Sequence, residues 1–298
     1  MSDEKKFQSG FVSIVGRPNV GKSTILNAFL GEKLSITSSK PQTTRNRITG
    51  IVSSENCQAI FLDTPGIHLA QTVFNKKILD EALKALQHVD LIMYLVEPSL
   101  RIGEEDGYIL DKLSESNIKK ILIVNKIDTV TKDTLLPIVD KYKSRCDFSD
   151  IFMVSALKND GVGSLLSSIK EMLPEGPRYF DEDYITDRPE RFLAAEMIRE
   201  KVFNLTQQEI PYSTAVVVES FKEKPAQNLV VIEAVVIVEK DSQKGIVIGQ
   251  GGKMLKKIGA DARKELEAFL NVRVFLKLFV KVSKNWTKSE KKLEEYVY

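Results

Sequence analysis

The apolar positions of the first 173 residues fall into short runs separated by longer amphipathic stretches. The runs are rich in β-branched side chains and are FVSIV (11–15), QAIFLD (58–63), LIMYLV (91–96), ILIVNK (121–126) and IFMVSA (151–156). Runs of this kind are typical of buried parallel strands. The stretches between them predict helices near 22–30, 75–88, 104–116, 133–145 and 161–172. Regular alternation of strand and helix predicts an α/β fold, a doubly wound, mostly parallel sheet that binds ligands at the carboxyl ends of its strands.

The pattern changes in the segment LPEGPRYFDEDYITDRPERF (173–192), which is rich in proline and acidic residues and predicts a linker. A different order of elements follows it: a helix (190–208), two strands (213–222 and 229–240), a glycine cluster between two helices, and a last strand (272–282). This order predicts a smaller α+β domain. We therefore expect domains at 1–173 and 191–298, joined by a linker at 174–190.

Length and composition agree with two soluble domains. The chain has 298 residues, of which 43% are hydrophobic and 28% charged. The N-terminus MSDEKKFQSG lacks the apolar stretch of a signal peptide, and no run is long enough to span a membrane, so we expect a cytoplasmic protein. The two cysteines, Cys57 and Cys146, and the two histidines, His68 and His88, have no metal-like spacing and predict no zinc site.

Charge is unevenly distributed along the chain. Residues 244–298 contain 13 Lys and Arg against 6 Asp and Glu, a net charge of +7. Because the whole chain carries +2, the remainder carries −5. A basic segment of this kind is often only a solvated surface, but attached to an acidic body it also suggests a module that binds a polyanion.

A phosphate-binding loop follows the first strand. GRPNVGKS matches the pattern G-x-x-x-x-G-K-[ST] directly after FVSIV and directly before a helix, which is the context that a P-loop requires. Lys22 is predicted to reach the β- and γ-phosphates, and the Ser23 hydroxyl to bind Mg²⁺. The predicted loop residues are Gly16, Arg17, Pro18, Asn19, Val20, Gly21, Lys22, Ser23 and Thr24.

The base is predicted to be guanine. In NKID (125–128), Asp128 can accept hydrogen bonds from guanine N1–H and from the exocyclic amine, which adenine does not offer. Asn125 is expected to hold the loop and the base edge, and the Lys126 stem to cover the ring. In SAL (155–157), the Ala156 amide is expected near guanine O6. These predicted contacts are Asn125, Lys126, Asp128, Ser155, Ala156 and Leu157.

DTPG (63–66) ends the second apolar run, and its four residues Asp63, Thr64, Pro65 and Gly66 are predicted to face the nucleotide. Asp63 would hold Mg²⁺ and the Gly66 amide would contact the γ-phosphate. The polar segment SSKPQTTRNRITG predicts a switch loop whose threonine caps Mg²⁺. Thr44 is favoured, although the sequence does not separate it from Thr43.

The catalytic residues are predicted to be Lys22, Thr44 and Gly66. Ile67 stands where many regulatory GTPases have a glutamine that orients water, so intrinsic hydrolysis is expected to be slow. Asn19 is a candidate ligand for a monovalent cation such as potassium.

The second glycine cluster, IGQGGK (248–253), lacks the Lys-[Ser/Thr] ending of a P-loop and lies between two helices. It matches G-x-x-G, the loop with which KH domains clamp single-stranded RNA, although a glycine-rich turn between helices has the same pattern. The predicted RNA-binding residues are Ile248, Gly249, Gln250, Gly251, Gly252, Lys253, Lys256 and Lys257.

Taken together, GRPNVGKST, KPQTTRNRITGI, DTPGIH, NKID, SAL, DYITDRPERFLAAEMIREKVF, EIPYS and VIGQGGKMLKKIGADAR resemble Era, a family of bacterial GTPases with a type II KH domain. The resemblance covers about residues 11–286. It implies GTP and GDP with Mg²⁺ as ligands, and assistance in assembly of the small ribosomal subunit through binding near the 3′ end of 16S rRNA. Gln250 departs from the family, in which a lysine is common at this position.

The leading interpretation is a monomeric GTPase switch that controls RNA binding. An RNA chaperone that uses GTP only as a structural ligand is one alternative. A GTPase of the inner-membrane surface, held weakly by the basic segment, is another.

Overall fold

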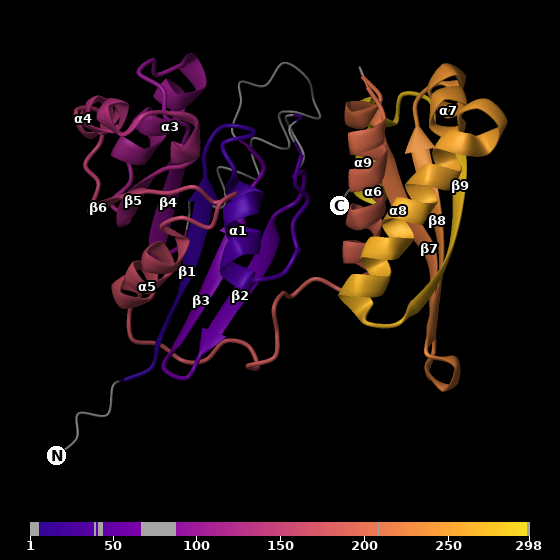
Figure 1. Cartoon of the computed structure of the whole chain (residues 1–298), viewed down its shortest axis with the longest axis horizontal. Coiled ribbons are helices and arrows are strands. Elements are labelled where there is room, and N and C mark those ends of the chain that lie inside the picture. Colours follow the sequence, from indigo (N-terminus) through magenta and orange to yellow (C-terminus); the bar gives the residue numbers. More distant parts are fainter. Residues whose placement is uncertain (1–5, 39, 41–43, 67–87, 208, 297–298) are drawn as a thin grey trace. The chain divides into compact units, whose positions relative to one another are not determined.

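The computed structural model describes residues 6–38, 40, 44–66, 88–207 and 209–296. These divide into two compact units, and in the second half of the chain the boundary lies between Asp187 and Arg188. Each unit has its own sheet and its own hydrophobic core (Figure 1). Among the described residues, no helix combines the length and apolarity needed to cross a membrane.

The first unit is a six-stranded sheet of order β2-β3-β1-β4-β5-β6. All pairs are parallel except β2 with β3. The strands are β1 (Gln8–Val15), β2 (Ile48–Ser54), β3 (Cys57–Asp63), β4 (Leu91–Val96), β5 (Lys120–Val124) and β6 (Asp150–Met153). The predicted doubly wound, mostly parallel sheet is confirmed.

Helices cover both faces of this sheet. They are α1 (Lys22–Leu30), α3 (Glu104–Ser114), α4 (Leu135–Lys143) and α5 (Val162–Met172). Helices α1 and α5 pack together on β1 and β3, whereas α3 and α4 contribute buried residues such as Leu110 and Ile138 to the core on β4 and β5. The predicted helix at 75–88 lies outside the described residues, apart from His88.

The second unit has the order α6 (Glu190–Leu205), β7 (Ala215–Lys224), β8 (Leu229–Val238), α7 (Asp241–Ile248), α8 (Lys253–Leu270), β9 (Arg273–Val282) and α9 (Glu290–Tyr296). Its sheet has the order β7-β8-β9, with β8 antiparallel to β7 and parallel to β9. Helices α6 and α8 pack on one face of this sheet (Figure 1). Trp286 is fully buried and its indole N–H donates to the Ser213 carbonyl at 3.0 Å, so it belongs to the interior of this unit.

The segment predicted as a linker is hydrogen-bonded to the first sheet up to its last residues. Gln58 of β3 is fully buried, and its Oε1 accepts the N–H groups of Tyr179 at 2.8 Å and Phe180 at 3.0 Å. Its Nε2 donates to the Phe180 carbonyl at 2.9 Å and to Ser53 Oγ at 3.0 Å. The side chain of Gln58 therefore acts as an anchor for the segment 174–187.

The same segment pairs with the open edge of the sheet. The Ile51 N–H of β2 donates to the Ile185 carbonyl at 2.8 Å, and Thr49 Oγ1 donates to Asp187 Oδ2 at 3.1 Å. Strand β2 would otherwise expose its unpaired backbone groups, which is a liability in edge strands. Residues 174–187 thus cover β2 as a strap.

Gln58→Ala should release this strap, because it removes the shared acceptor of two partly buried backbone N–H groups. We expect the free energy of unfolding to fall by about 2–4 kcal/mol, and the amides of 176–187 to lose protection in hydrogen exchange. Ser53→Ala is the matched control, since it removes one bond of Gln58 and leaves the strap contacts intact. Unchanged protection in Gln58→Ala would contradict the anchor role.

Candidate functional site

The predicted phosphate loop lies between β1 and α1, at the carboxyl edge of the first sheet. Gly16, Asn19 and Gly21 have positive φ angles of 154°, 66° and 101°. Gly21 caps α1 without a side-chain hydrogen bond, and the first turn of α1 contains no acidic residue. The N–H groups of this turn are therefore available to an anion, as phosphate binding requires.

Lys22 lies inside the curve of the loop. Its side chain is 6% exposed, and Nζ donates to the carbonyls of Gly16 at 3.1 Å and Arg17 at 2.9 Å. The loop is fixed from outside by Arg17, whose Nε lies 2.8 Å from Oδ2 of the buried Asp106. Asp106 also accepts the Tyr94 hydroxyl at 2.9 Å, which ties the loop to α3 and β4.

The three predicted magnesium ligands meet at the end of β3. Ser23 Oγ donates to Asp63 Oδ2 at 2.8 Å and lies 3.0 Å from Thr44 Oγ1. Ser35 Oγ also donates to Asp63 Oδ2, at 2.7 Å. Asp63 is fully buried, and its Oδ1 has no hydrogen-bond partner among the described residues. A buried carboxylate oxygen beside two hydroxyl groups is an oxygen-only donor set, which fits Mg²⁺. The alternative threonine, Thr43, lies outside the described residues.

The DTPG segment packs directly on the phosphate loop. The Thr64 hydroxyl donates to the Ile14 carbonyl of β1 at 2.8 Å. A Cβ added to Gly66 would lie 2.6 Å from the Pro18 nitrogen and 2.7 Å from its Cα, so no larger residue fits there without movement of the backbone. Ile67 and His68 lie outside the described residues.

Two further loops meet the phosphate loop at the end of β5 and β6. Asn125 is buried, its Nδ2 donates to the Val20 carbonyl at 2.8 Å, and its Oδ1 accepts the Ala156 N–H at 2.9 Å. Ser155 Oγ donates to Asp128 Oδ1 at 2.6 Å, which orients the exposed carboxylate. One asparagine thus joins three loops, and a serine fixes the group predicted to select the base.

Around the base position, Lys126 pairs with Glu97, which holds its long side chain, and Leu157 is 76% exposed. The Ala156 N–H, predicted to contact guanine O6, already donates to Asn125. Its contact with the base stays a prediction.

The second glycine cluster joins α7 to α8. Gly249, Gly251 and Gly252 have φ angles of 72°, 59° and 77°, so the loop uses positive φ three times. A Cβ on Gly249 would lie 2.6 Å from Met254 Cβ, whereas a Cβ on Gly251 or Gly252 would meet no atom within 4 Å. The loop is thus open to a ligand at its last two glycines, while Gly249 packs against α8.

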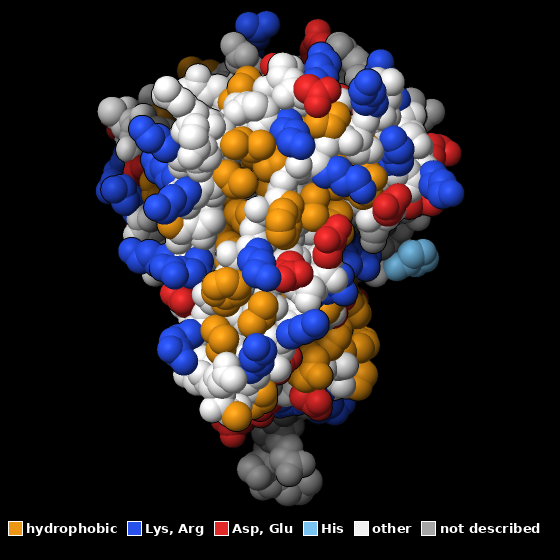
Figure 2. Space-filling model, turned by 90° about the vertical axis from the view of Figure 1, so that its right-hand side faces the viewer, with side chains coloured by type: hydrophobic (Ala, Val, Ile, Leu, Met, Phe, Trp, Pro, Cys, Tyr) orange, Lys and Arg blue, Asp and Glu red, His pale blue; other side chains and the backbone are white. Residues whose placement is uncertain are grey.

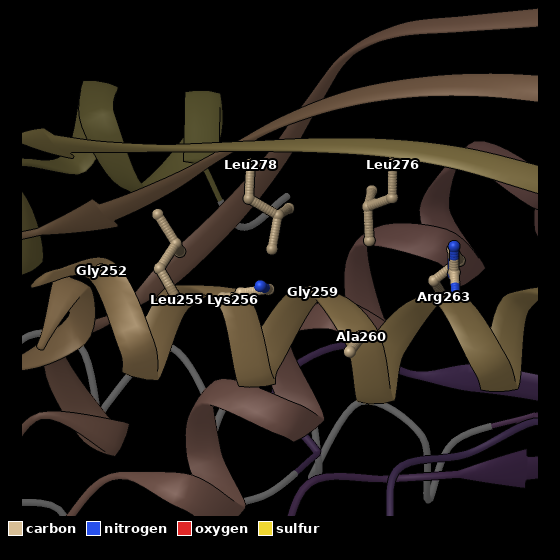
Figure 3. Close-up of a pocket in the computed structure, with 8 residues that line it drawn as sticks. All are labelled: Gly252, Leu255, Lys256, Gly259, Ala260, Arg263, Leu276 and Leu278. Carbon is tan, nitrogen blue, oxygen red and sulfur yellow. The ribbon is translucent and has the colours of Figure 1, made fainter.

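A groove of about 510 Å³ lies between α8 and β9 (Figure 3). Its lining is apolar with two cations and consists of Gly252, Leu255, Lys256, Gly259, Ala260, Arg263, Leu276 and Leu278. In Figure 3, Leu276 and Leu278 point from β9 toward α8. The groove therefore combines a glycine loop and positive charge with a floor that can accept flat apolar groups.

Comparison with known proteins finds a family match in each of the two units. Residues 11–126 match a family described as 50S ribosome-binding GTPase, and residues 209–287 match the KH domain family. GTPase Era of Geotalea uraniireducens (strain Rf4) is 53% identical over 295 residues, and GTPase Era of Geobacter sp. (strain M21) is 54% identical over 295 residues. Each alignment covers 99% of both chains. This chain belongs to the GTPase Era family.

Two solved Era structures have the same fold, each with a TM-score of 0.94 and 38% identity over 98% of this chain and 99% of theirs. One is Era in complex with MgGDPNP and nucleotides 1506–1542 of 16S ribosomal RNA. The other is a variant of Aquifex aeolicus Era bound to GDP and tetrafluoroaluminate. Membership of the Era family makes the chain a GTPase, and the predicted fold of a GTPase domain followed by a KH domain is confirmed.

Several residues of these sites were not predicted. Ser35 belongs to no motif; Asn27 holds it, because Asn27 Oδ1 accepts the N–H groups of Leu34 at 3.0 Å and Ser35 at 2.8 Å. In the groove, Gly259, Ala260 and Arg263 follow Lys256 at helical spacing, and this spacing was the available signal. Leu276 and Leu278 could be assigned to the groove only from the structure, which shows that α8 packs beside β9. Val247, next to the predicted residue Ile248, does not line the groove and is buried in the core.

Burial sets the protonation chemistry of the GTP pocket of this Era-family protein. Burial lowers the pKa of Lys22 to about 8, against the opposing charges of Asp63 and Glu105. Burial also raises the pKa of Asp63. The charge of Lys22 and the hydroxyls of Ser35 and Ser23 oppose this rise but do not cancel it. Because the Lys22 pKa is lower in the folded chain than in the unfolded chain, its charge opposes folding at neutral pH, and this penalty fades as pH rises from 8 toward 10.5.

GTP binding should take up a proton near pH 8. The triphosphate stabilises the charged form of Lys22 and raises its pKa again, so about half a proton should be bound per GTP at that pH. Calorimetry in buffers of different ionisation enthalpy measures this uptake, and GTP affinity should fall as pH rises above 8. Lys132→Met, which removes an exposed lysine outside the pocket, is the control and should keep the uptake. Binding without proton uptake at pH 8 would show that Lys22 is fully charged beforehand.

Proposed function

We propose that this Era-family GTPase couples GTP binding at the edge of the first sheet to binding of single-stranded RNA between α8 and β9. Its RNA is proposed to be the region near the 3′ end of 16S rRNA, and its role to be assistance in maturation of the small ribosomal subunit. The observation that carries the proposal is the presence of both a phosphate-loop pocket and a basic glycine-loop groove on one chain. Support comes from the Era complex that contains MgGDPNP and 16S rRNA nucleotides, at a TM-score of 0.94.

In the GTP pocket, Ser23, Thr44 and Asp63 would hold Mg²⁺. Mg²⁺ neutralises charge on the β- and γ-phosphates during phosphoryl transfer. Lys22 would bind the same phosphates. Because Lys22 is buried, water screens its charge little, and its attraction to the phosphates is stronger than at the surface. The Gly66 amide would contact the γ-phosphate, so loss of that phosphate on hydrolysis would release the DTPG segment from the ligand.

Guanine selection would fall to Asp128. Ser155 occupies Oδ1 of its carboxylate at 2.6 Å, which fixes the plane of the group before a base arrives. Both carboxylate oxygens still have lone pairs for the two guanine donors. Adenine offers neither donor at that edge, and it would leave the carboxylate without partners in the complex.

In the KH groove, the loop 249–252 would receive the sugar–phosphate backbone, while Lys253, Lys256 and Lys257 supply positive charge. All three lysines are exposed, as contacts with a polymer require. Leu255, Leu276 and Leu278 would contact base faces. Arg263 joins them at the other end of the groove, where a guanidinium can pair with a phosphate or stack on a base.

Other expectations stay predictions from sequence. They are the monomeric state, the cytoplasmic location, a weak contact with the inner-membrane surface and the exact domain boundaries 1–173, 174–190 and 191–298. Hydrolysis of GTP as the family activity argues against GTP as a purely structural ligand.

Gly251→Asp should weaken RNA binding by roughly tenfold or more, because it places a negative charge where phosphate is expected. Asp tolerates the left-handed backbone at φ 59°, and space for a side chain is open, so the fold should persist. Gly251→Asn has the same shape without the charge and is the matched control. Affinity for a 16S 3′-end oligoribonucleotide is measured in the empty, GDP and GTP-analogue forms of the full chain.

GTP affinity should be unchanged in both variants. If Gly251→Asp binds RNA as tightly as the Asn control, the KH groove is not the RNA site. If the unaltered protein binds RNA equally in all three nucleotide forms, the two sites are not coupled.

Asn19 is proposed as a ligand for potassium beside the phosphates. Its backbone lies in the left-handed region at φ 66°, at the tip of the phosphate loop. GTP turnover should then be faster in potassium than in sodium buffer, and Asn19→Ala should abolish the difference. Equal turnover of the unaltered protein in both salts would remove this proposal.

A further inference from the structure

Helices α6 and α8 pack on one face of the KH sheet, and the side chains of β9 on its other face are exposed. Strand β9 alternates strictly: Val274, Leu276, Leu278, Val280 and Val282 join the core beneath α6 and α8. The intervening residues Arg273, Phe275, Lys277, Phe279 and Lys281 point to the other face, and all five are exposed. Phe275 and Phe279 are 50% and 54% exposed, which is unusual for such large apolar side chains.

The register of the sheet shows what surrounds these rings. Phe275 lies opposite Val231 of β8, and Phe279 lies opposite Val235, which itself lies opposite Val217 of β7. The neighbours of the two rings across the sheet on this face are therefore valines. Figure 2 views this side, and shows hydrophobic side chains along the middle of the face with Lys and Arg on either side of them.

Positive charge dominates the same face. Besides the three cations of β9, the register places Lys222 and Lys224 of β7 on it, opposite Val231 and Leu229. Glu233 is the acid of β8 on this face, and its carboxylate lies 2.8 Å from Lys277 Nζ. A hydrogen bond and the charge of Lys277, together with Lys222, lower the pKa of Glu233. One further acid, Glu219, stands at the β-bulge between Val218 and Ser220.

We propose that the face of β7–β8–β9 opposite α6 and α8, which we call the outer KH face, is a second contact surface for single-stranded RNA. Phe275 and Phe279 each stack on a base, and Arg273, Lys277 and Lys281 bind the phosphates between and beside them. The rings are four positions apart along the strand, about 13 Å, so they contact different bases. Aromatic rings interleaved with cations are the usual composition of surfaces that bind single strands without reading sequence.

The outer KH face is continuous with the proposed RNA groove. Strand β9 is the edge strand of the sheet, so nothing in the sheet lies beyond it. Leu276 and Leu278 line the groove on one side of β9, while Phe275 and Phe279 stand on the other. An RNA strand leaving the groove can pass over the free edge of β9 and reach the two rings.

The chemistry favours RNA over a protein partner. The cores of protein–protein interfaces are depleted in lysine, whereas here a cation follows each ring along the strand. Lys277 Nζ lies 5.8 Å from the centre of the Phe275 ring, so charge sits at the middle of the patch and not at its rim. A polyanion with flat apolar bases satisfies both features at once.

The inference rests on the proposed RNA-binding function, and the test separates the two. The double variant Phe275→Leu, Phe279→Leu keeps apolar side chains but removes the rings. Full-length protein is titrated with a labelled oligoribonucleotide of about four nucleotides, enough for the groove, and with one of about twelve nucleotides. Tyr184→Leu, which removes a 52% exposed ring outside the KH unit, is the matched control.

Loss of two stacked bases should lower affinity for the longer RNA at least tenfold, while affinity for the shorter RNA and for GTP stays within about twofold. Replacement of both rings by Trp should restore affinity for the longer RNA. If Gly251→Asp weakens binding of both RNAs but the Leu pair changes neither, the outer KH face does not bind RNA. If Gly251→Asp itself changes neither, the proposed function fails first.

Two other outcomes would also overturn the proposal. One is that the Leu pair leaves RNA affinity unchanged and alters sedimentation of the protein, which would indicate a self-association surface. The other is that it abolishes pelleting with vesicles of anionic lipid while RNA affinity stays unchanged, which would indicate a membrane contact.

Discussion

The buried charges of Lys22 and Asp63 are the constraint on which the GTP pocket depends. Neither can leave the interior, because Lys22 is held by the carbonyls of Gly16 and Arg17 and Asp63 by the hydroxyls of Ser23 and Ser35. Burial disfavours the charged form of each. Their mutual attraction opposes that effect, together with the charge of Glu105 at Lys22 and the two hydroxyls at Asp63. A fold optimised for stability alone would place no such pair there. The pair is explained by a ligand that carries both negative charge and a divalent cation, because that ligand satisfies both groups at once.

The elements that carry this pocket could be read from the sequence because their signals are local. The phosphate loop is contiguous, and each strand that ends at it is a compact apolar run. Strand ends were less accurate: ILIVNK and IFMVSA each continue past the last residue in the sheet, since Asn125 and Ser155 already belong to loops that bind partners across the pocket. Strand β2 was missed because ITGIVSS is polar at one end and pairs antiparallel at the edge, where no continuous apolar run is needed.

Contacts between residues far apart in the chain could not be predicted in this way. Gln58 anchors Tyr179 and Phe180 across more than 120 positions, and nothing in the composition of 174–187 separates a bound strap from a free linker. The same holds for Ser35, which reaches Asp63 only because Asn27 fixes the intervening loop. The sequence predicted those residues of the GTP pocket that belong to motifs. It did not predict the polar residues outside motifs, such as Ser35 and Asn27, that complete the hydrogen bonding.

The two faces of β9 show how far composition can indicate function. On the helix side, valine and leucine are required because α8 must pack there, so those residues say little beyond the core. On the outer KH face, Phe275 and Phe279 are half exposed, and a strand that only had to fold would carry small or polar residues at these positions. Exposed rings at 275 and 279 lower solubility and contribute little to the fold, and exposed cations such as those beside them contribute little to stability. Because the fold does not require Phe275, Phe279 and the cations beside them, binding of a ligand explains their presence best. A chain that binds RNA both in the groove and on the outer KH face would have a higher affinity than the groove alone. Once RNA is bound in the groove, its effective concentration at the outer KH face is high, so the second contact forms readily.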